Sequence, residues 1–504
     1  MEDEQRPDDD VTSQEAVRRE KRERLLADGH PPYPVTLPRT HTLAEVREKW
    51  GHLETGEETQ DVVGVAGRVM FVRNTGKLCF ATLQEGVGTR LQVMLSLAEV
   101  GEDALEEWKR LVDLGDHVFV QGRVISSRRG ELSVMASEWR MASKALRPLP
   151  VLHKDLSEEA RVRQRYADLI VRQEARDMVR LRAAVLRSVR ATLDGFDFIE
   201  VETPMLQLVH GGAAARPFTT HLNAFDQDMT LRIAIELYLK RAVVGGVDRV
   251  YEIGRIFRNE GVDSTHSPEF TMLEYYEAYG DQFTAADRMQ DIIVNAAEAS
   301  GAGLRLVDYR GQEVDLSGEW RWLPLADAVA EAVGEEVSIE ETPENAARLR
   351  ALADAREVNV KPTWGAGEII LELFEQLVEE NLVQPTFVCD YPEALRPLAR
   401  AHRSKPGAVE AWDLFIGGVE LGVSYSELVD PVVQRERLTE QSLLAAGGDP
   451  EAMQLDEDFL RALEYGGPPM GGSGLGIDRL VMLLSGVGIR ETILFPHVRP
   501  ETHR

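Results

Sequence analysis

The chain has 504 residues, 43% of them hydrophobic, and a formal net charge of −29 at pH 7. One hydrophobic core does not support this length, so two or more domains are expected. Cys79 and Cys389 lie far apart, which excludes a disulfide framework or a cysteine zinc site. The sequence shows neither an apolar signal core nor a run near the ~20 residues of a membrane span. These features predict a cytoplasmic protein without membrane association.

The N-terminal region is strongly charged. Residues 1–11 are acidic and predict a disordered tail. Residues 12–58 form an N-terminal helical segment that begins with TSQEAVRREKRERLLADGH, a helix with Arg and Lys on most faces. Such a helix is typical either of a solvated surface or of contact with phosphate groups, and the pattern does not separate the two.

Residues 59–146 change to short β segments with glycine-containing turns, such as LCFATLQ and HVFVQGRVI. Five such segments in this space favour a small closed barrel of the OB-fold type. These barrels often bind single-stranded nucleic acid through aromatic and polar side chains. Arg68, Phe80, Gln92 and Glu131 are the candidates, although each alone is also compatible with ordinary barrel surface or core.

The second half of the chain has a different organisation. The Pro-bearing, polar stretch 147–160 predicts a linker, and the last domain is expected over 161–504. An Arg-rich helical region opens this domain, and strands and helices then mix without strict alternation. This mixture favours an α+β domain, an antiparallel sheet flanked by helices.

The stretch FRNEGVDSTHSPEFTMLE, from Phe257 to Glu274, predicts strand, loop and strand. Residues two apart in a strand share a face, so Arg258 and Glu260 point the same way. The second strand likewise places four residues on one face: Phe270, Met272, Glu274 and Tyr276. A purely structural hairpin would more often turn apolar residues to its core face. The pattern therefore favours a functional cleft.

A second constellation is WDLFIGGVELG, over residues 412–422. Gly417 and Gly418 predict a two-residue hairpin turn, which pairs Asp413 with Gly422 and makes Asp413 and Glu420 diagonal neighbours. Two carboxylates so placed repel each other unless a cation lies between them. Mg²⁺ held together with a polyphosphate fits, because Mg²⁺ favours one or two carboxylates plus phosphate oxygens. Two solvated acids on an edge hairpin are the simpler alternative.

The same strand continues as VSYSELVD. Strict alternation places Val423, Tyr425 and Glu427 on the face opposite Glu420. All four can line one cavity only if the strand bulges near Gly422, where glycine permits a bulge.

The third constellation is GGSGLGIDRLVMLLSGVGIRETILFP, over residues 471–496. A glycine-rich strand leads into an apolar helix, with Arg479 near the junction. Glycines allow close approach of a flat or phosphorylated ligand, and arginine offers a planar fork for phosphate. The stretch is not a Walker P-loop, because no GKS or GKT follows.

Together these stretches resemble the three signature motifs of class II aminoacyl-tRNA synthetases, and the match to the bacterial-type lysyl-tRNA synthetases covers almost the whole chain. Its pieces include RQRYADLI, EVETPML, GGAAARPF, ELYLKR, FRNEG, PEFTMLE, FIGGVELG and GLGIDRLVML. The resemblance implies an OB-fold that binds the anticodon and a catalytic domain on a six-stranded antiparallel sheet. It implies Mg²⁺- and ATP-dependent activation of L-lysine, transfer to tRNA(Lys), and a homodimer through motif 1 around Pro204.

The resemblance also implies residue roles. Arg258, Glu260 and Arg479 would be catalytic, with Arg258 on the α-phosphate and the amino-acid carboxylate. Glu260 and His266 would hold ATP, adenine would stack between Phe270 and Arg479, and Asp413 and Glu420 would bind Mg²⁺. The lysine-binding set would be Gly212, Glu236, Arg258, Glu274, Tyr276, Tyr425 and Glu427. Within it, Glu236 would meet the α-ammonium, and Glu274, Tyr276 and Glu427 the ε-ammonium. In the barrel, Phe80 would stack on an anticodon base while Gln92 and Glu131 read its edges.

Several positions depart from the family pattern. Thr265 stands where an arginine is expected, Val423 where an asparagine would help to bind the amino-acid carboxylate, and Asp413 where glutamate is usual. Smaller departures are Ser267 and Val429 for asparagine, Ile235 for proline, and Asp197 for glycine. Losing a hydrogen bond to a charged group costs about 1.5–3 kcal/mol. Two alternatives therefore stay open: a divergent paralogue that uses a lysine-like amino acid, and a non-catalytic tRNA-binding paralogue.

Overall fold

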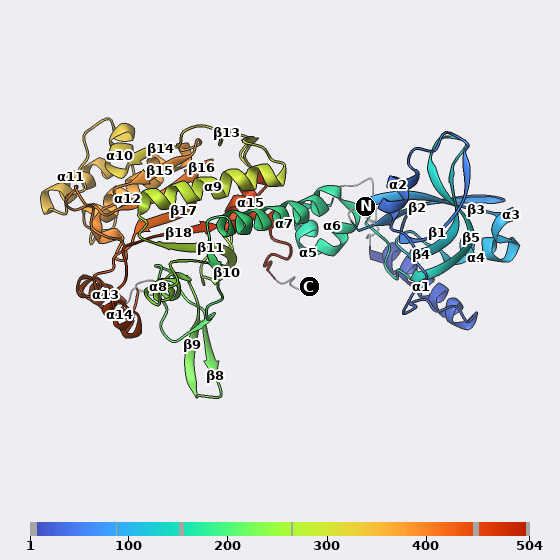
Figure 1. Ribbon diagram of the computed structural model, residues 1–504, viewed down its shortest axis with the longest axis horizontal. Coiled ribbons are helices and arrows are strands. Elements are labelled where there is room, and N and C mark those ends of the chain that lie inside the picture. The colour runs from blue at the N-terminus through green and yellow to red at the C-terminus, as the bar shows by residue number, and fades with distance from the viewer. Residues whose placement is uncertain (1–7, 87, 151–155, 264–265, 447–452, 500–504) are drawn as a thin grey trace, which may run out of the picture. The chain divides into compact units, whose positions relative to one another are not determined.

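The computed structural model describes residues 8–86, 88–150, 156–263, 266–446 and 453–499, with no side chains described for 8–12 and 444–446. The chain divides into two compact units, Met1–Asp177 and Met178–Arg504. The second unit is drawn in green to red in Figure 1. The predicted linker 147–160 lies partly outside the described residues. The predicted catalytic domain, from residue 161, begins before the second compact unit.

The first unit contains a closed barrel with the strand order β1-β2-β3-β5-β4, which confirms the predicted OB-fold. Its strands are β1 (Glu58–Thr75), β2 (Leu78–Glu85), β3 (Thr89–Ser96), β4 (His117–Ser126) and β5 (Leu132–Ser143). Every second side chain of a strand points into the barrel and fills its interior, as in β2, where Cys79, Ala81 and Leu83 are buried.

The first unit also contains helices. They are α1 (Asp8–Ala27), α2 (Leu43–Trp50), α3 (Leu97–Val100), α4 (Glu102–Leu111), α5 (Glu158–Arg163) and α6 (Arg165–Val171). Residues 8–11, predicted to be disordered, thus belong to α1, and residues 1–7 lie outside the described part. Two basic residues of α1 contact the barrel, since Arg18 donates to Leu114 O and Ala145 O and Lys21 pairs with Asp113 at 2.6 Å. Part of its positive charge therefore stabilises the first unit.

The second unit is built on an eight-stranded sheet with the order β14-β15-β16-β17-β18-β11-β10-β6 (Figure 1). The six inner strands pair antiparallel, while β14 and β6 add parallel edges. The expected six-stranded antiparallel sheet is therefore extended by one strand at each side. The strands are β6 (Ile199–Glu200), β10 (Arg249–Phe257), β11 (Glu269–Ala278), β14 (Arg321–Pro324), β15 (Thr386–Cys389), β16 (Ala411–Ile416), β17 (Val419–Ser426) and β18 (Met470–Gly476).

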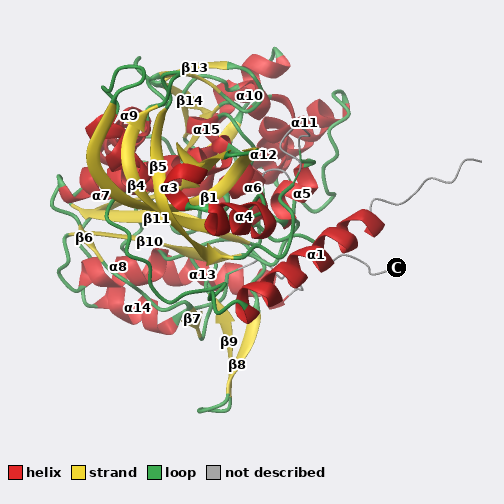
Figure 2. Cartoon of the chain, turned by 90° about the vertical axis from the view of Figure 1, so that its right-hand side faces the viewer, coloured by secondary structure: helices red, strands yellow, loops and turns green. Residues whose placement is uncertain are grey.

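Two smaller sheets complete the strand content. One pairs β12 (Arg305–Val307) with β13 (Glu313–Asp315), and the other has the order β7-β9-β8. The strands of the latter are β7 (Leu206–Gln207), β8 (Thr219–Leu222) and β9 (Gln227–Leu231). The β8–β9 hairpin projects away from the large sheet (Figure 2).

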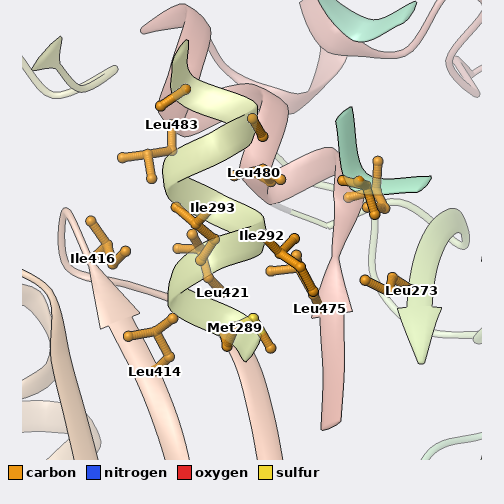
Figure 3. Packing of buried hydrophobic residues seen from close by; sticks show 14 of the residues in the cluster. Leu273, Met289, Ile292, Ile293, Leu414, Ile416, Leu421, Leu475, Leu480 and Leu483 are labelled. Atoms are coloured by element: carbon orange, nitrogen blue, oxygen red, sulfur yellow. The ribbon is translucent and has the colours of Figure 1, made fainter. Parts of the chain in front are cut away.

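One face of the large sheet packs on long helices. These are α7 (Gln173–Asp194), α9 (Gln282–Ser300) and α15 (Ile477–Ser485), and α15 is followed by α16 (Ile489–Thr492). Figure 3 shows Met289, Ile292 and Ile293 of α9 among leucines of the strands. These side chains belong to one buried apolar cluster, which fixes the sheet from this side.

The opposite face is covered only at its two ends. Beside β15 and β16 lie α10 (Leu325–Val333), α11 (Pro343–Asp354), α12 (Ala366–Leu377) and the short helices η1 (Glu379–Asn381) and η2 (Glu393–Leu395). Beside β10 and β11 lies α8 (Glu236–Val244), which contacts α14 (Glu457–Glu464) and through it α13 (Pro431–Ala446). In the described part of the chain, β17, β18 and part of β11 border an open space between these covers.

The turn from α7 into β6 contains one of the departures from the family pattern. Asp197 has a φ of 61°, in the left-handed region that favours glycine. Aspartate is among the few other residues that adopt this conformation at modest cost. The backbone that a glycine would provide is therefore retained.

Candidate active site

A cavity of about 410 Å³ opens on the uncovered middle of the sheet. Its walls come from β11, β17 and β18, from the ends of β10 and α8, and from the loop after Gly211. Most of the sequence-predicted catalytic-domain residues line it: Gly212, Glu236, Arg258, Glu260, His266, Phe270, Glu274, Tyr276, Asp413, Glu420, Tyr425, Glu427 and Arg479. Segments almost 270 residues apart in the chain are thus brought to one site.

The hairpin β16–β17 differs from the predicted register. Ile416 pairs with Val419 and Phe415 with Glu420, as the Gly417–Gly418 turn predicts, but the register then shifts. Asp413 pairs with Val423, so the predicted pairing of Asp413 with Gly422 is wrong. The shift places one extra residue, Leu421, in β17, and Leu421 packs into the core on the far face. The bulge expected near Gly422 is therefore confirmed, and it brings Glu420, Val423 and Glu427 to one cavity.

One end of the cavity carries the two arginines. Arg258 follows the last residue of β10, and its guanidinium lies 5.3 Å from the centre of the Phe270 ring. Burial lowers the pKa of Arg258, although the nearby negative charges of Glu260 and Glu420 act to raise it. Arg479, in the first turn of α15, donates to Glu420 O at 2.6 Å. A flat ring and two cations thus face the same space, as binding of a nucleotide requires.

The loop between β10 and β11 is described only in part, because Thr265 lies outside the described residues. His266 pairs with Asp263 at 2.9 Å, and Ser267 Oγ donates to Glu269 O at 2.8 Å. Ser267, at an expected asparagine position, therefore helps to close the loop onto β11. Glu260 is exposed at the cavity mouth.

The two carboxylates predicted to bind metal have different surroundings. Asp413 is buried and paired with Arg396, while Glu420 is half-buried with its Oε1 3.9 Å from Arg479 Nη1. Burial raises the pKa of Asp413 to about 6, although Arg396 acts in the opposite direction. Asp413 Oδ1 is buried without a hydrogen-bond partner in the described part of the chain. Among the described residues no group of three or more metal-ligating side chains occurs, so the pair would need further ligands.

The other end of the cavity is acidic and buried. Glu274 Oε1 accepts the Ile235 N–H at 2.9 Å and its Oε2 accepts the Tyr276 hydroxyl at 3.3 Å. Burial, together with nearby Glu236, raises the pKa of Glu274 to about 7. A proline at 235, which the family pattern expects, has no N–H. This departure therefore gives Glu274 an additional donor.

Glu236 and Glu427 share a partner that the sequence did not single out. Lys240 Nζ lies 2.6 Å from Glu236 Oε1 and 2.5 Å from Glu427 Oε2, and all three side chains are buried. Burial raises the pKa of Glu427 to about 8, against the influence of Lys240. Glu427 Oε1 has no hydrogen-bond partner among the described residues. Lys240 lies in ELYLKR, a piece of the family resemblance, and its position four residues after Glu236 puts both on one helical face, but neither signal assigned it a role.

Several further cavity positions are small or apolar, although Arg396 and Asp478 also line the cavity. Gly212 has a φ of 85°, and a Cβ there would lie 3.1 Å from Glu236 Cβ. Val423 and Tyr425 line the wall next to Asp413 and Glu427. Val429 instead packs against the apolar cluster of α8, so its substitution for asparagine does not alter the cavity wall.

Gly472 of β18 supports the acidic end by its lack of a side chain. A Cβ there would lie 2.2 Å from Glu427 Oε1 and 2.3 Å from Tyr276 Cε1. We expect Gly472→Ala to displace both groups and to raise the lysine KM about tenfold in lysine-dependent ATP–pyrophosphate exchange. Gly467→Ala is the matched control, because a Cβ at Gly467 meets only ordinary contacts from 3.4 Å. Equal lysine KM values for the two variants would contradict this role.

The predicted anticodon residues lie on the barrel of the first unit. Phe80 and Gln92 belong to the outward faces of β2 and β3, where Arg73 lies over the Phe80 ring at 4.9 Å. Gln92 donates to Ser133 Oγ, and Glu131 pairs with Arg47 of α2 at 3.2 Å. Arg68 is turned to the main chain, donating to Gly115 O, and burial lowers its pKa.

Comparison with known families agrees with this architecture. Residues 157–499 match the tRNA synthetases class II (D, K and N), and residues 63–142 match the OB-fold nucleic acid binding domain. The chain therefore belongs to the class II tRNA synthetases of this group. Among its relatives, the lysine–tRNA ligase of Kineococcus radiotolerans is 59% identical over 98% of both chains. That of Mycobacterium bovis is 56% identical over 98% of this chain and 99% of the relative.

A further relative is longer than this chain. The lysylphosphatidylglycerol biosynthesis bifunctional protein of Mycobacterium marinum is 50% identical over 97% of this chain but only 44% of its own length. No helix in the described part of the present chain is long and apolar enough to cross a membrane. The near full-length identity to lysine–tRNA ligases does not favour the divergent or non-catalytic alternatives.

Proposed function

We propose that this protein is a lysine–tRNA ligase, which activates L-lysine with ATP in the cavity and transfers it to tRNA(Lys). The observation that carries the proposal is the acidic end of the cavity. Glu236, Glu274 and Glu427 are buried there, Lys240 pairs with Glu236 and Glu427, and Glu427 Oε1 lacks a hydrogen-bond partner among the described residues. A buried carboxylate is stable in its charged form only beside a cation, and the ammonium groups of lysine supply one.

The arginine end suits the chemistry of activation. The lysine carboxylate attacks the α-phosphate of ATP, its oxygen forms the new P–O bond, and the bond to the leaving pyrophosphate breaks. This step needs positioning and stabilisation of negative charge more than a protein nucleophile. Arg258 is placed between the acidic end and Phe270, where it contacts both the carboxylate and the α-phosphate. Phe270 and Arg479 hold the adenine between them, with Glu260 and His266 at the cavity mouth.

Mg²⁺ fits the pair Asp413 and Glu420 in donor chemistry. Both are carboxylates that line the cavity, and Asp413 Oδ1 has a free acceptor position among the described residues. Phosphate oxygens of ATP would complete the coordination shell of the ion, as is usual for Mg²⁺. When bound, it would neutralise charge on the phosphates. Arg396 restrains the other oxygen of Asp413.

The partners follow from the same assignment. The outward face of the barrel, with Phe80 and Gln92, binds the anticodon of tRNA(Lys) by stacking and base-edge contacts. Motif 1 forms the contact of a homodimer in the cytoplasm. In its support, apolar side chains are exposed beside the sheet edge, including Ile199 at 57% and Leu208 at 60%.

Amino-acid-dependent ATP–pyrophosphate exchange tests the function directly. Lysine should support exchange and aspartate and asparagine should not, because an anionic or neutral distal group cannot replace an ammonium beside Glu274 and Glu427. Chelation of Mg²⁺ should abolish the exchange, and aminoacylation should require tRNA(Lys). Exchange with none of the amino acids, together with tight tRNA binding, would overturn the proposal.

A further inference from the structure

Lys240 is a buried cation beneath the substrate cavity and not part of its wall. Its side chain is 1% exposed, and the lining residues include Glu236 and Glu427 but not Lys240. It projects from the second turn of α8 and reaches Glu427, which directly follows β17. One ammonium group therefore joins the helix that covers the cavity to the strand that forms its floor.

The geometry gives each carboxylate one oxygen on Lys240 and leaves the other for the cavity. Lys240 Nζ contacts Glu236 Oε1 and Glu427 Oε2. The other oxygen of Glu236 lies toward Gly212, 3.7 Å from the position of a Cβ on that residue. The other oxygen of Glu427, Oε1, has no hydrogen-bond partner among the described residues, while Oε2 meets Lys240 as an ion pair and not as a hydrogen bond of good geometry. Fixing one oxygen of a carboxylate also fixes the direction in which the other one accepts.

The charges at this end of the cavity are also matched to a substrate with two ammonium groups. Three carboxylates, Glu236, Glu274 and Glu427, are buried here, and Lys240 pairs with two of them, Glu236 and Glu427. Burial opposes the charge on Lys240, but Glu236 and Glu427 outweigh it and raise the pKa of Lys240 above its usual value. Lys240 pairs with two of the three carboxylates, and burial still raises the pKa of Glu274 to about 7 and of Glu427 to about 8, so the ammonium groups of a bound lysine would stabilise their charged forms.

We propose that Lys240 is a positioning residue that sets the affinity for the amino acid, by orienting the carboxylates of Glu236 and Glu427 toward a diamino substrate. The inference rests on the proposed function. It concerns the amino-acid end alone, because Lys240 contacts neither Arg258 nor Phe270 nor Arg479 at the nucleotide end.

The test uses the full-length protein with Lys240→Met, which retains the length of the side chain and removes its charge. We expect the lysine KM in pyrophosphate exchange to rise about tenfold or more, the loss of one charged hydrogen bond. The ATP KM should stay within about twofold of the parent. Arg241→Met is the matched control, since Arg241 is the next residue of α8 and pairs with Asp456 and Asp458 outside the cavity.

A pH series separates positioning from a general loss of structure. The pKa of Glu427 is raised to about 8 even though Lys240 acts to lower it, so without Lys240 the carboxyl keeps its proton to higher pH. The lysine KM of Lys240→Met should therefore fall toward the parent value only as the pH rises above about 8. The other titratable or charged groups that face Glu427 are the same in the parent and in Lys240→Met, so their effect on the pH dependence is common to both proteins. They are Glu236, Glu274, Tyr276 and Tyr425 on the cavity side, and Asp281, Arg400, Arg403 and Glu410 on the far side.

The outcomes are distinct. A selective rise in the lysine KM supports the inference, and parallel changes in the lysine and ATP KM values, or a parent-like lysine KM, overturn it. If Lys240→Met does not fold, Lys240→Arg is judged by the same criterion, because its planar fork moves both carboxylates while retaining the charge. A parent protein without any lysine-dependent exchange would instead refute the proposed function.

Discussion

Replacing Arg258 by alanine is expected to lower the rate of lysine-dependent pyrophosphate exchange by about 10²–10³-fold. Removing one preorganised donor from a developing negative charge costs about this much in other enzymes. Arg258 is held over the Phe270 ring and has its pKa lowered by burial, so its guanidinium is poorly solvated and interacts strongly with phosphate. The loss should appear in kcat more than in the KM for ATP, because the charge grows in the transition state.

The matched control is Arg255→Ala. Arg255 lies on the same strand, β10, and its nearest charged partner is Glu269 at 3.5 Å. It does not line the cavity, so its removal should leave exchange within about twofold of the parent. An Arg258→Ala protein that exchanges at the parental rate would refute the catalytic assignment.

Replacing Glu274 by glutamine is expected to reduce kcat/KM for lysine by at least about 100-fold, because breaking a buried ion pair costs about 3–5 kcal/mol. The KM for ATP should change little. Glutamine retains the volume of the side chain and an oxygen that accepts the Ile235 N–H. Glu277→Gln, on the opposite face of the same strand, controls for the loss of a carboxylate from β11.

Glu274→Gln should also change the pH dependence of the free energy of unfolding, measured without ligand. The folded-state pKa of Glu274 is raised from 4.5 to about 7, so the folded protein retains a proton that the unfolded chain has lost. The free energy of unfolding therefore falls by about 3 kcal/mol as the pH rises from the unfolded-state pKa to the folded-state pKa of Glu274. Above the folded-state pKa it stays constant. Glu274→Gln should lose less stability than the parent between pH 5 and 8 in urea unfolding. Identical pH dependence would show that Glu274 is not held in a desolvated site.

The sequence predicts most of what backbone periodicity controls. Alternation placed Phe270, Met272, Glu274 and Tyr276 on one face of β11, and all four line the cavity. The need for a bulge near Gly422 also followed from alternation, because Glu420 and Glu427 could not otherwise meet. The position of the bulge did not follow, since it depends on which residue fits the core, and that residue is Leu421.

Long-range ion pairs were the main features that sequence reasoning missed. Arg396 pairs with Asp413, and Lys240 lies between Glu236 and Glu427, although arginine and lysine are ordinarily assigned to the surface. Glu131 was considered as a base-reading group or as ordinary barrel surface, and its ion pair with Arg47 was not predicted. Such partners are set by tertiary packing, and hydrophobic periodicity carries no signal for them.

The irregularity in β17 has a consequence for how this enzyme can change. A single strand reaches the reacting centre twice, with Glu420 before Leu421 on the nucleotide side and Val423 to Glu427 after it on the amino-acid side. The backbone of β17 therefore sets the distance between the two substrate sites, and side-chain rotamers do not change it. Exchanging side chains beyond Gly422 can alter which amino acid is accepted while ATP stays in place, whereas deleting one residue would uncouple the two halves of the reaction.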